Sequence, residues 1–93
     1  MNINQDLVER TKVASYKAIK KWGIESQLDM MREEATELLM ELARLPRKRT
    51  TDEKILEEVV DTYIMVHEMI CIYGEDKFNE MLRKKLERFE SRL

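Results

Sequence analysis

The chain has 93 residues, of which 39% are charged and 43% are apolar, with two glycines, one proline and one cysteine. This length allows one domain with a modest core, and the scarcity of glycine and proline favours an all-helical protein. The net charge of −2 excludes a general attraction for nucleic acid or an anionic membrane, and the lone Cys71 excludes an internal disulfide. We expect Cys71 to be a small buried hydrophobe.

The first residues of the chain and the length of its apolar runs indicate the cellular compartment in which we expect the protein. The first residues lack the basic head and apolar core of a signal peptide, and no apolar run is long enough to span a bilayer. We therefore expect a cytoplasmic protein whose partners include neither a membrane nor nucleic acid.

Two helices are predicted in the first half of the chain. The first covers about residues 4–21, and Gly23 ends it. The second covers about residues 26–44 and begins where Ser26 and Asp29 resemble a capping box with a shorter acid.

Two further helices are predicted in the second half. The third follows the capping box Thr50-Thr51-Asp52-Glu53 and ends at Gly74, and the fourth covers about residues 76–92. Short joints imply antiparallel neighbours, so the second and third helices are expected to form a hairpin. The sequence thus predicts one all-α domain over residues 1–93, a four-helix antiparallel bundle-like fold.

The third helix is apolar on nearly every side from Val59 to Tyr73. Three short neighbouring helices would not cover so much apolar surface. We therefore expect self-association as a dimer or dimer of dimers, with a monomeric bundle as the alternative.

Four pairs of acids have the three-residue spacing that places both side chains on one side of a helix: Asp6/Glu9, Glu34/Glu37, Glu58/Asp61 and Glu87/Glu90. The first and last pairs lie among polar residues and are expected to be solvated. The middle pairs lie on the predicted hairpin, where four carboxylates would converge. Such a cluster repels itself unless cations fill it, and oxygen ligands suit Mg²⁺ or Mn²⁺. The alternative is salt bridges on the surface or between subunits.

Five other residues are candidates for substrate contact. Lys85, Arg88 and Arg92 form a basic stripe that would either hold a polyphosphate or simply complement the dipole of the last helix. Trp22 would either stack on a nucleobase or plug the end of the bundle. Gln27 would either read a base edge or remain an exposed first-turn residue.

The order of these motifs resembles a known family. Glu33-Glu34-Ala35-Thr36-Glu37-Leu38, followed by Glu57-Glu58-Val59-Val60-Asp61, is similar to the ExxE…ExxD signature of the MazG-like all-α nucleoside triphosphate pyrophosphohydrolases. The resemblance covers about Lys17 to Leu93. It includes a lead-in over residues 21–30 and a closing helix over residues 84–92. Two positions depart from the pattern, Thr36 where many relatives have a small residue and Leu86 where some have a polar one.

The resemblance implies a helical fold with its active site at or near a dimer interface. It also implies Mg²⁺-dependent hydrolysis of nucleoside triphosphates to monophosphate and pyrophosphate. By position, the resemblance makes four acids the metal ligands: Glu34, Glu37, Glu58 and Asp61. It makes three basic residues the phosphate contacts: Lys85, Arg88 and Arg92. Glu37 is the candidate general base. The alternatives are a non-enzymatic helical interaction module and a pyrophosphohydrolase acting on phosphoribosyl-ATP or a similar compound.

Overall fold

The computed structural model describes residues 4–93, and within this range it contains helices and no strand. The elements are α1 (Gln5–Trp22), α2 (Ile24–Arg44), the short 3₁₀ helix η1 (Leu45–Arg47), α3 (Asp52–Tyr73) and α4 (Glu75–Glu90). The prediction of an all-helical protein with four helices is confirmed. No helix among the described residues is long and apolar enough to cross a membrane.

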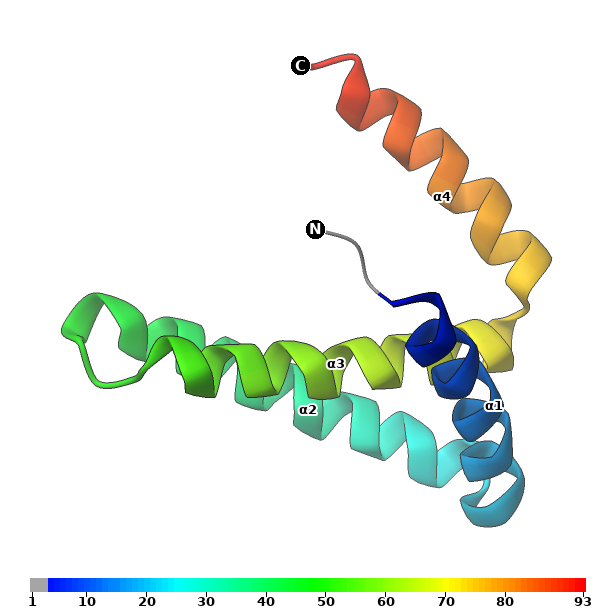
Figure 1. Ribbon diagram of the computed structural model, residues 1–93, viewed down its shortest axis with the longest axis horizontal. Helices are drawn as coiled ribbons and strands as arrows, with labels where there is room; N and C mark the ends of the chain where they lie inside the picture. The colour runs from blue at the N-terminus through cyan, green and yellow to red at the C-terminus, as the bar shows by residue number, and fades with distance from the viewer. Residues whose placement is uncertain (1–3) are drawn as a thin grey trace.

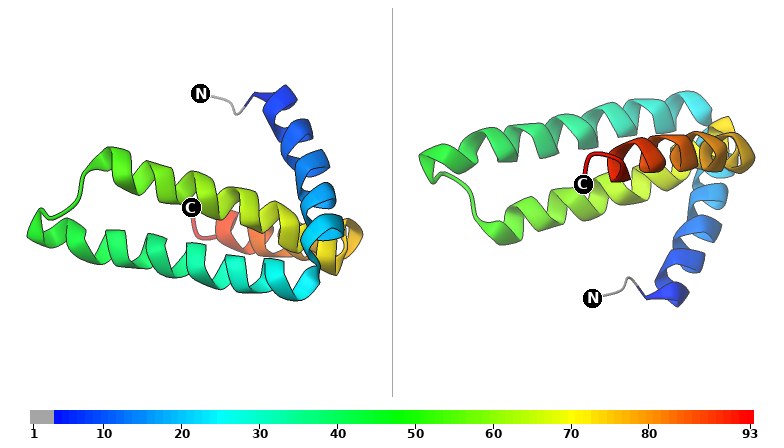
Figure 2. Two further views of the ribbon diagram at one scale, coloured as in Figure 1. Left: turned by 90° about the horizontal axis from the view of Figure 1, so that it is seen from below. Right: turned by 90° about the horizontal axis from the view of Figure 1, so that it is seen from above.

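The centre of the fold is an antiparallel hairpin of α2 and α3, which contact each other along most of their length (Figure 1). Helix α1 crosses one end of this hairpin and contacts both of its helices. Helix α4 contacts α3 alone among the described elements and extends away from the other three (Figures 1 and 2). The predicted antiparallel packing is therefore present in α2 and α3, whereas the four helices do not close into a bundle within one chain.

Two glycines turn the chain between helices. Gly23 has φ 89° and Gly74 has φ 104°, conformations that side-chain-bearing residues rarely adopt. Each ends one helix by donating its N–H to a carbonyl four residues earlier, at 2.8 Å, and each caps the next helix. Helix α2 consequently begins at Ile24, before the predicted start at Ser26, because the glycine cap makes a serine capping box unnecessary.

The start of α3 is tied to the end of α2. The Thr51 hydroxyl, rather than that of Thr50, caps α3 by accepting the Lys54 N–H at 3.2 Å. The Thr50 hydroxyl instead donates to the Glu41 carboxylate of α2. This contact joins the two helices at the tip of the hairpin and supports their alignment.

Few apolar side chains are buried in one chain. Met65 of α3, 5% exposed, is the buried apolar residue among those described, and the other buried side chains are Ser15, Gln27 and Glu68. Large apolar residues remain exposed along α2, α3 and α4, among them Leu39, Leu56, Val60, Met81 and Phe89. Cys71 is also exposed, so the expectation that it would be buried was wrong. The predicted assembly into a dimer or dimer of dimers stays a prediction.

Candidate metal centre

The α2–α3 hairpin brings three of the predicted ligands together. One carboxylate oxygen each from Glu34, Glu37 and Glu58 lies within 4.8 Å of the other two. Glu34 and Glu58 are partly buried between the helices, and Glu37 is exposed. The Thr62 hydroxyl of α3 donates to the Glu34 carbonyl at 3.5 Å, which supports the alignment of the two helices at this point.

Asp61, the fourth predicted ligand, lies outside this group of three. Its side chain is exposed and borders a separate surface depression of about 470 Å³ beside Val60. Its negative charge nevertheless raises the pKa values of Glu34 and Glu58, so it lies within electrostatic reach of both. Asp61 thus stands at the rim of the cluster.

Burial is the largest cause of the raised pKa values of Glu34 and Glu58. The negative charges of Glu37 and Asp61 come next for both residues. For Glu58 a hydrogen bond with Glu37 adds to the shift, because only a protonated carboxyl can donate it. The negative charges of these acids therefore repel one another at neutral pH.

Two oxygens of this cluster, Glu34 Oε2 and Glu58 Oε2, are buried without a hydrogen-bond partner. Within residues 4–93, no lysine or arginine forms an ion pair with Glu34, Glu37, Glu58 or Asp61. Salt bridges within one chain therefore do not explain the cluster. Burying a carboxylate oxygen without a hydrogen-bond partner lowers the stability of the fold. Carboxylate oxygens are the ligands that Mg²⁺ and Mn²⁺ prefer, so a bound cation would satisfy them.

The two outer acid pairs differ from the cluster in their surroundings. Asp6 and Glu9 are exposed and lie 3.9 and 3.8 Å from the basic groups of Arg10 and Lys12. Glu87 and Glu90 are exposed on α4. The same spacing thus gives a convergent site only where two helices pack.

The basic stripe lies apart from the acids within one chain. Lys85 and Arg88 are exposed on α4, and Arg92 is exposed beyond its last residue. Because α4 contacts only α3 and then extends away, the structure does not bring these three residues to the carboxylate cluster (Figure 1).

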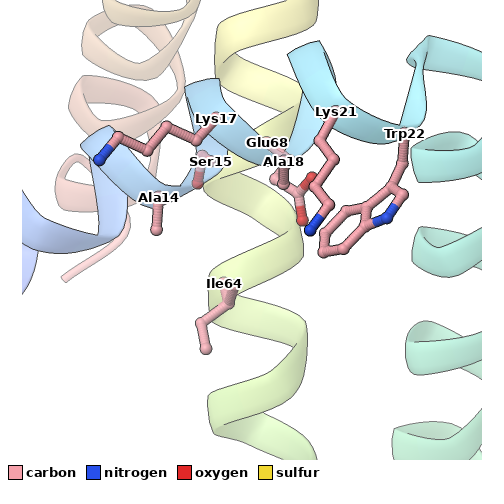
Figure 3. Close-up of a pocket in the computed structure, with 8 residues that line it drawn as sticks. All are labelled: Ala14, Ser15, Lys17, Ala18, Lys21, Trp22, Ile64 and Glu68. Carbon is pink, nitrogen blue, oxygen red and sulfur yellow. The ribbon is translucent and has the colours of Figure 1, made fainter.

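Trp22 and Gln27 have different surroundings from each other. Trp22 is 58% exposed and lines a cavity between α1 and α3 (Figure 3), so within one chain it does not plug the end of the bundle. Gln27 is only 4% exposed. With its amide oriented to donate, Gln27 Nε2 lies 3.1 Å from Glu68 Oε2. Gln27 is therefore not an exposed first-turn residue, and its amide N–H group is directed at Glu68. Its contact with a base stays a prediction.

Glu68 and Ser15 are buried polar residues that the sequence-based site did not include. Glu68 is 4% exposed and Ser15 is 1% exposed, and both line the same cavity as Trp22. A signal for Glu68 was present, since it is an acid in an apolar helix seven residues after Asp61, two turns along the same side. Nothing in the sequence pattern marks Ser15.

Comparison with known families, curated proteins and solved structures found no match to this chain. The resemblance of its motifs to MazG-like enzymes stays a prediction. The chain itself combines a convergent group of carboxylates with buried polar residues beside a cavity.

Proposed function

We propose that this protein is a Mg²⁺-dependent nucleoside triphosphate pyrophosphohydrolase, which converts a nucleoside triphosphate to its monophosphate and pyrophosphate. The observation that carries the proposal is the convergence of Glu34, Glu37 and Glu58, with two buried carboxylate oxygens that lack partners. A helical interaction module has no need for such a repulsive cluster. The sequence motifs that contain these acids point to the same activity.

Glu34, Glu37 and Glu58 would hold the cation, with Asp61 as a further ligand from the rim. When bound, Mg²⁺ or Mn²⁺ neutralises the charge of the triphosphate and lowers the pKa of the attacking water. Glu34 and Glu58 are the better anchors because they are partly buried between two packed helices. Their positions require little reorganisation when the substrate binds.

Glu37 is the proposed general base. It is the exposed member of the three converging acids, so water reaches it, and its carboxylate takes the proton of the attacking water. The water oxygen forms a bond to the α-phosphorus while the bond from that phosphorus to the bridging oxygen breaks. Pyrophosphate leaves with the electron pair of that bond. The basic side chains of Lys85, Arg88 and Arg92 balance the charge of the leaving group.

We further propose that these basic side chains act on the acid cluster of a second copy. Within one chain α4 extends away from the cluster, and large apolar side chains on α3 and α4 are uncovered, among them Leu56, Val60, Met81 and Phe89. Apolar surface of this extent is characteristic of an interface. A dimer would cover it and complete the active site.

The test incubates the purified protein with common and damaged nucleoside triphosphates and phosphoribosyl-ATP, with and without Mg²⁺, and separates the products by chromatography. We expect monophosphate and pyrophosphate in equal amounts, only with metal. Glu58→Gln and Asp61→Asn should lose most of this activity, whereas Glu87→Gln, in an exposed acid pair of the same spacing, should retain it. Metal-independent turnover, or full turnover by Glu58→Gln, would contradict the proposal.

A helical interaction module is the second candidate, because the exposed apolar surface also suits a protein partner. It predicts no turnover of any triphosphate by a folded protein. It also predicts that Glu58→Gln leaves partner binding unchanged.

A further inference from the structure

A cavity lies one to two helical turns along α3 from Asp61, at the rim of the carboxylate cluster, and about two to three turns from Glu58 within the cluster. It is lined by residues of α1 and α3, and Figure 3 shows these side chains. Ile64 and Glu68, which line it, follow Asp61 by three and seven residues along α3. Seven residues of helix span about 10 Å, comparable to the length of a nucleoside monophosphate. A nucleotide with its phosphates at the Asp61 rim of the cluster would therefore reach this cavity with its base.

The walls of the cavity suit a flat ring. Ala14, Ala18 and Ile64 are apolar, and the exposed indole of Trp22 supplies a broad aromatic face. Lys21 Nζ lies 5.2 Å from the centre of that indole. The cavity measures about 380 Å³, within the usual range for small-molecule sites.

Of the two buried polar groups in this cavity, one lacks a hydrogen-bond partner and the other has acceptor positions to spare. Ser15 Oγ is buried and has no hydrogen-bond partner among the described residues. The Glu68 carboxylate accepts from the amide of Gln27, but a carboxylate has about four acceptor positions, so capacity remains. Burial also raises the pKa of Glu68, as expected for a carboxyl shielded from water. Leaving such groups unsatisfied is unfavourable in an apolar setting.

We propose that this cavity binds the nucleobase of the substrate and that Glu68 selects bases that carry an exocyclic amino group. The inference rests on the proposed function for the position of the phosphates. Cytosine, adenine and guanine offer an amino N–H that the charged Glu68 carboxylate accepts. Uracil and thymine instead present carbonyl oxygens at this position, which repel a carboxylate. Trp22 stacks on the ring, and Ser15 supplies a second hydrogen bond.

The most direct test compares dCTP with dUTP, because their bases differ by an amino group against a carbonyl. We expect the wild type to favour dCTP in kcat/KM by about tenfold or more. Glu68→Gln should reduce that ratio by about tenfold, since an amide can donate to the carbonyl of uracil. Glu87→Gln is the matched control and should keep the wild-type ratio. A preference for dUTP, or a ratio unchanged in Glu68→Gln, would overturn the inference.

A binding measurement separates this inference from the proposed hydrolysis. Trp22 is the single tryptophan of the chain, so its fluorescence reports base stacking with dCMP and dUMP without turnover. Tighter binding of dCMP, lost in Glu68→Gln, supports the base site even if no triphosphate is hydrolysed. Equal binding of both overturns it even if hydrolysis is found. If Glu68→Gln fails to fold by circular dichroism, Ser15→Ala replaces it, with weaker dCMP binding expected and unchanged binding counting against the proposal.

Discussion

Replacing Glu34 by glutamine is expected to stabilise the metal-free protein and to weaken its response to Mg²⁺. Burial, followed by the charges of Glu37, Asp61 and Glu58, raises the pKa of Glu34 above its ordinary value of 4.5. Below that value the carboxyl is protonated in both the folded and the unfolded chain. As the pH rises through the raised pKa of the folded protein, the carboxyl becomes charged among other acids and its contribution to stability is lost. Glutamine avoids this penalty at neutral pH.

The rise in Tm that Mg²⁺ causes can be calculated if the ion binds the folded chain and not the unfolded one. At a concentration ten times the dissociation constant, a ligand stabilises the fold by about 1.4 kcal/mol. With an unfolding entropy of about 2.1 cal/mol/K per residue, this raises the Tm of a 93-residue chain by about 7 °C. Loss of one of three converging carboxylates should weaken binding at least about tenfold. The same Mg²⁺ concentration would then raise the Tm of Glu34→Gln by about 2 °C or less.

The assay is thermal unfolding followed by far-ultraviolet circular dichroism at neutral pH, over a Mg²⁺ titration at constant ionic strength. Glu87→Gln changes an exposed acid on α4 and controls for the loss of one negative charge. It should respond to Mg²⁺ as the wild type does. A full Mg²⁺ response in Glu34→Gln would refute its role as a ligand. A lower Tm for this variant without metal would refute the argument from burial and repulsion.

Three further predictions concern the base, the assembly and the core. Glu37→Gln should lower kcat by about 10²- to 10⁴-fold in a pyrophosphate-release assay, and a loss below tenfold would exclude it as the general base. Glu58→Gln and Arg88→Ala should each be inactive alone, yet an equal mixture after subunit exchange should recover about a quarter of wild-type activity if each site combines two chains. No recovery, despite proven exchange, would place the whole site in one chain. Met65→Ala should lower the free energy of unfolding in urea by about 2–5 kcal/mol, and a loss under about 1 kcal/mol would show that Met65 is not packed in a core.

The helices were largely predictable because their ends depend on local chemistry. Gly23 and Gly74 end helices since a residue without a side chain adopts a positive φ at little cost. The exact caps were less predictable. Ser26 was predicted to cap α2, but Gly23 caps it instead. Thr50 was predicted to cap α3, but its hydroxyl donates to Glu41 on α2. When a side chain has two possible hydrogen-bond partners, the packing of the helices decides which of them it binds, and the local sequence does not contain that information.

The site was predictable in part for the same reason. The three-residue spacing placed Glu34 beside Glu37 on one helix, and a hairpin was enough to bring Glu58 to them. Asp61 has the same spacing from Glu58 but lies at the rim, because small differences in helix rotation decide which member of a pair faces the neighbouring helix. The burial of Gln27 against Glu68 depends on the same packing.

The sequence by itself therefore determined the helical class, the breaks at the glycines and the acid pairs, since these depend on residues within one or two turns of each other. Only the tertiary structure decided which carboxylates converge and that Glu68 and Ser15 share a cavity with Trp22. It also decided that α4 leaves the hairpin instead of closing a bundle. These outcomes arise from contacts between helices distant in the chain, where packing and burial, rather than local preference, set the position of each side chain.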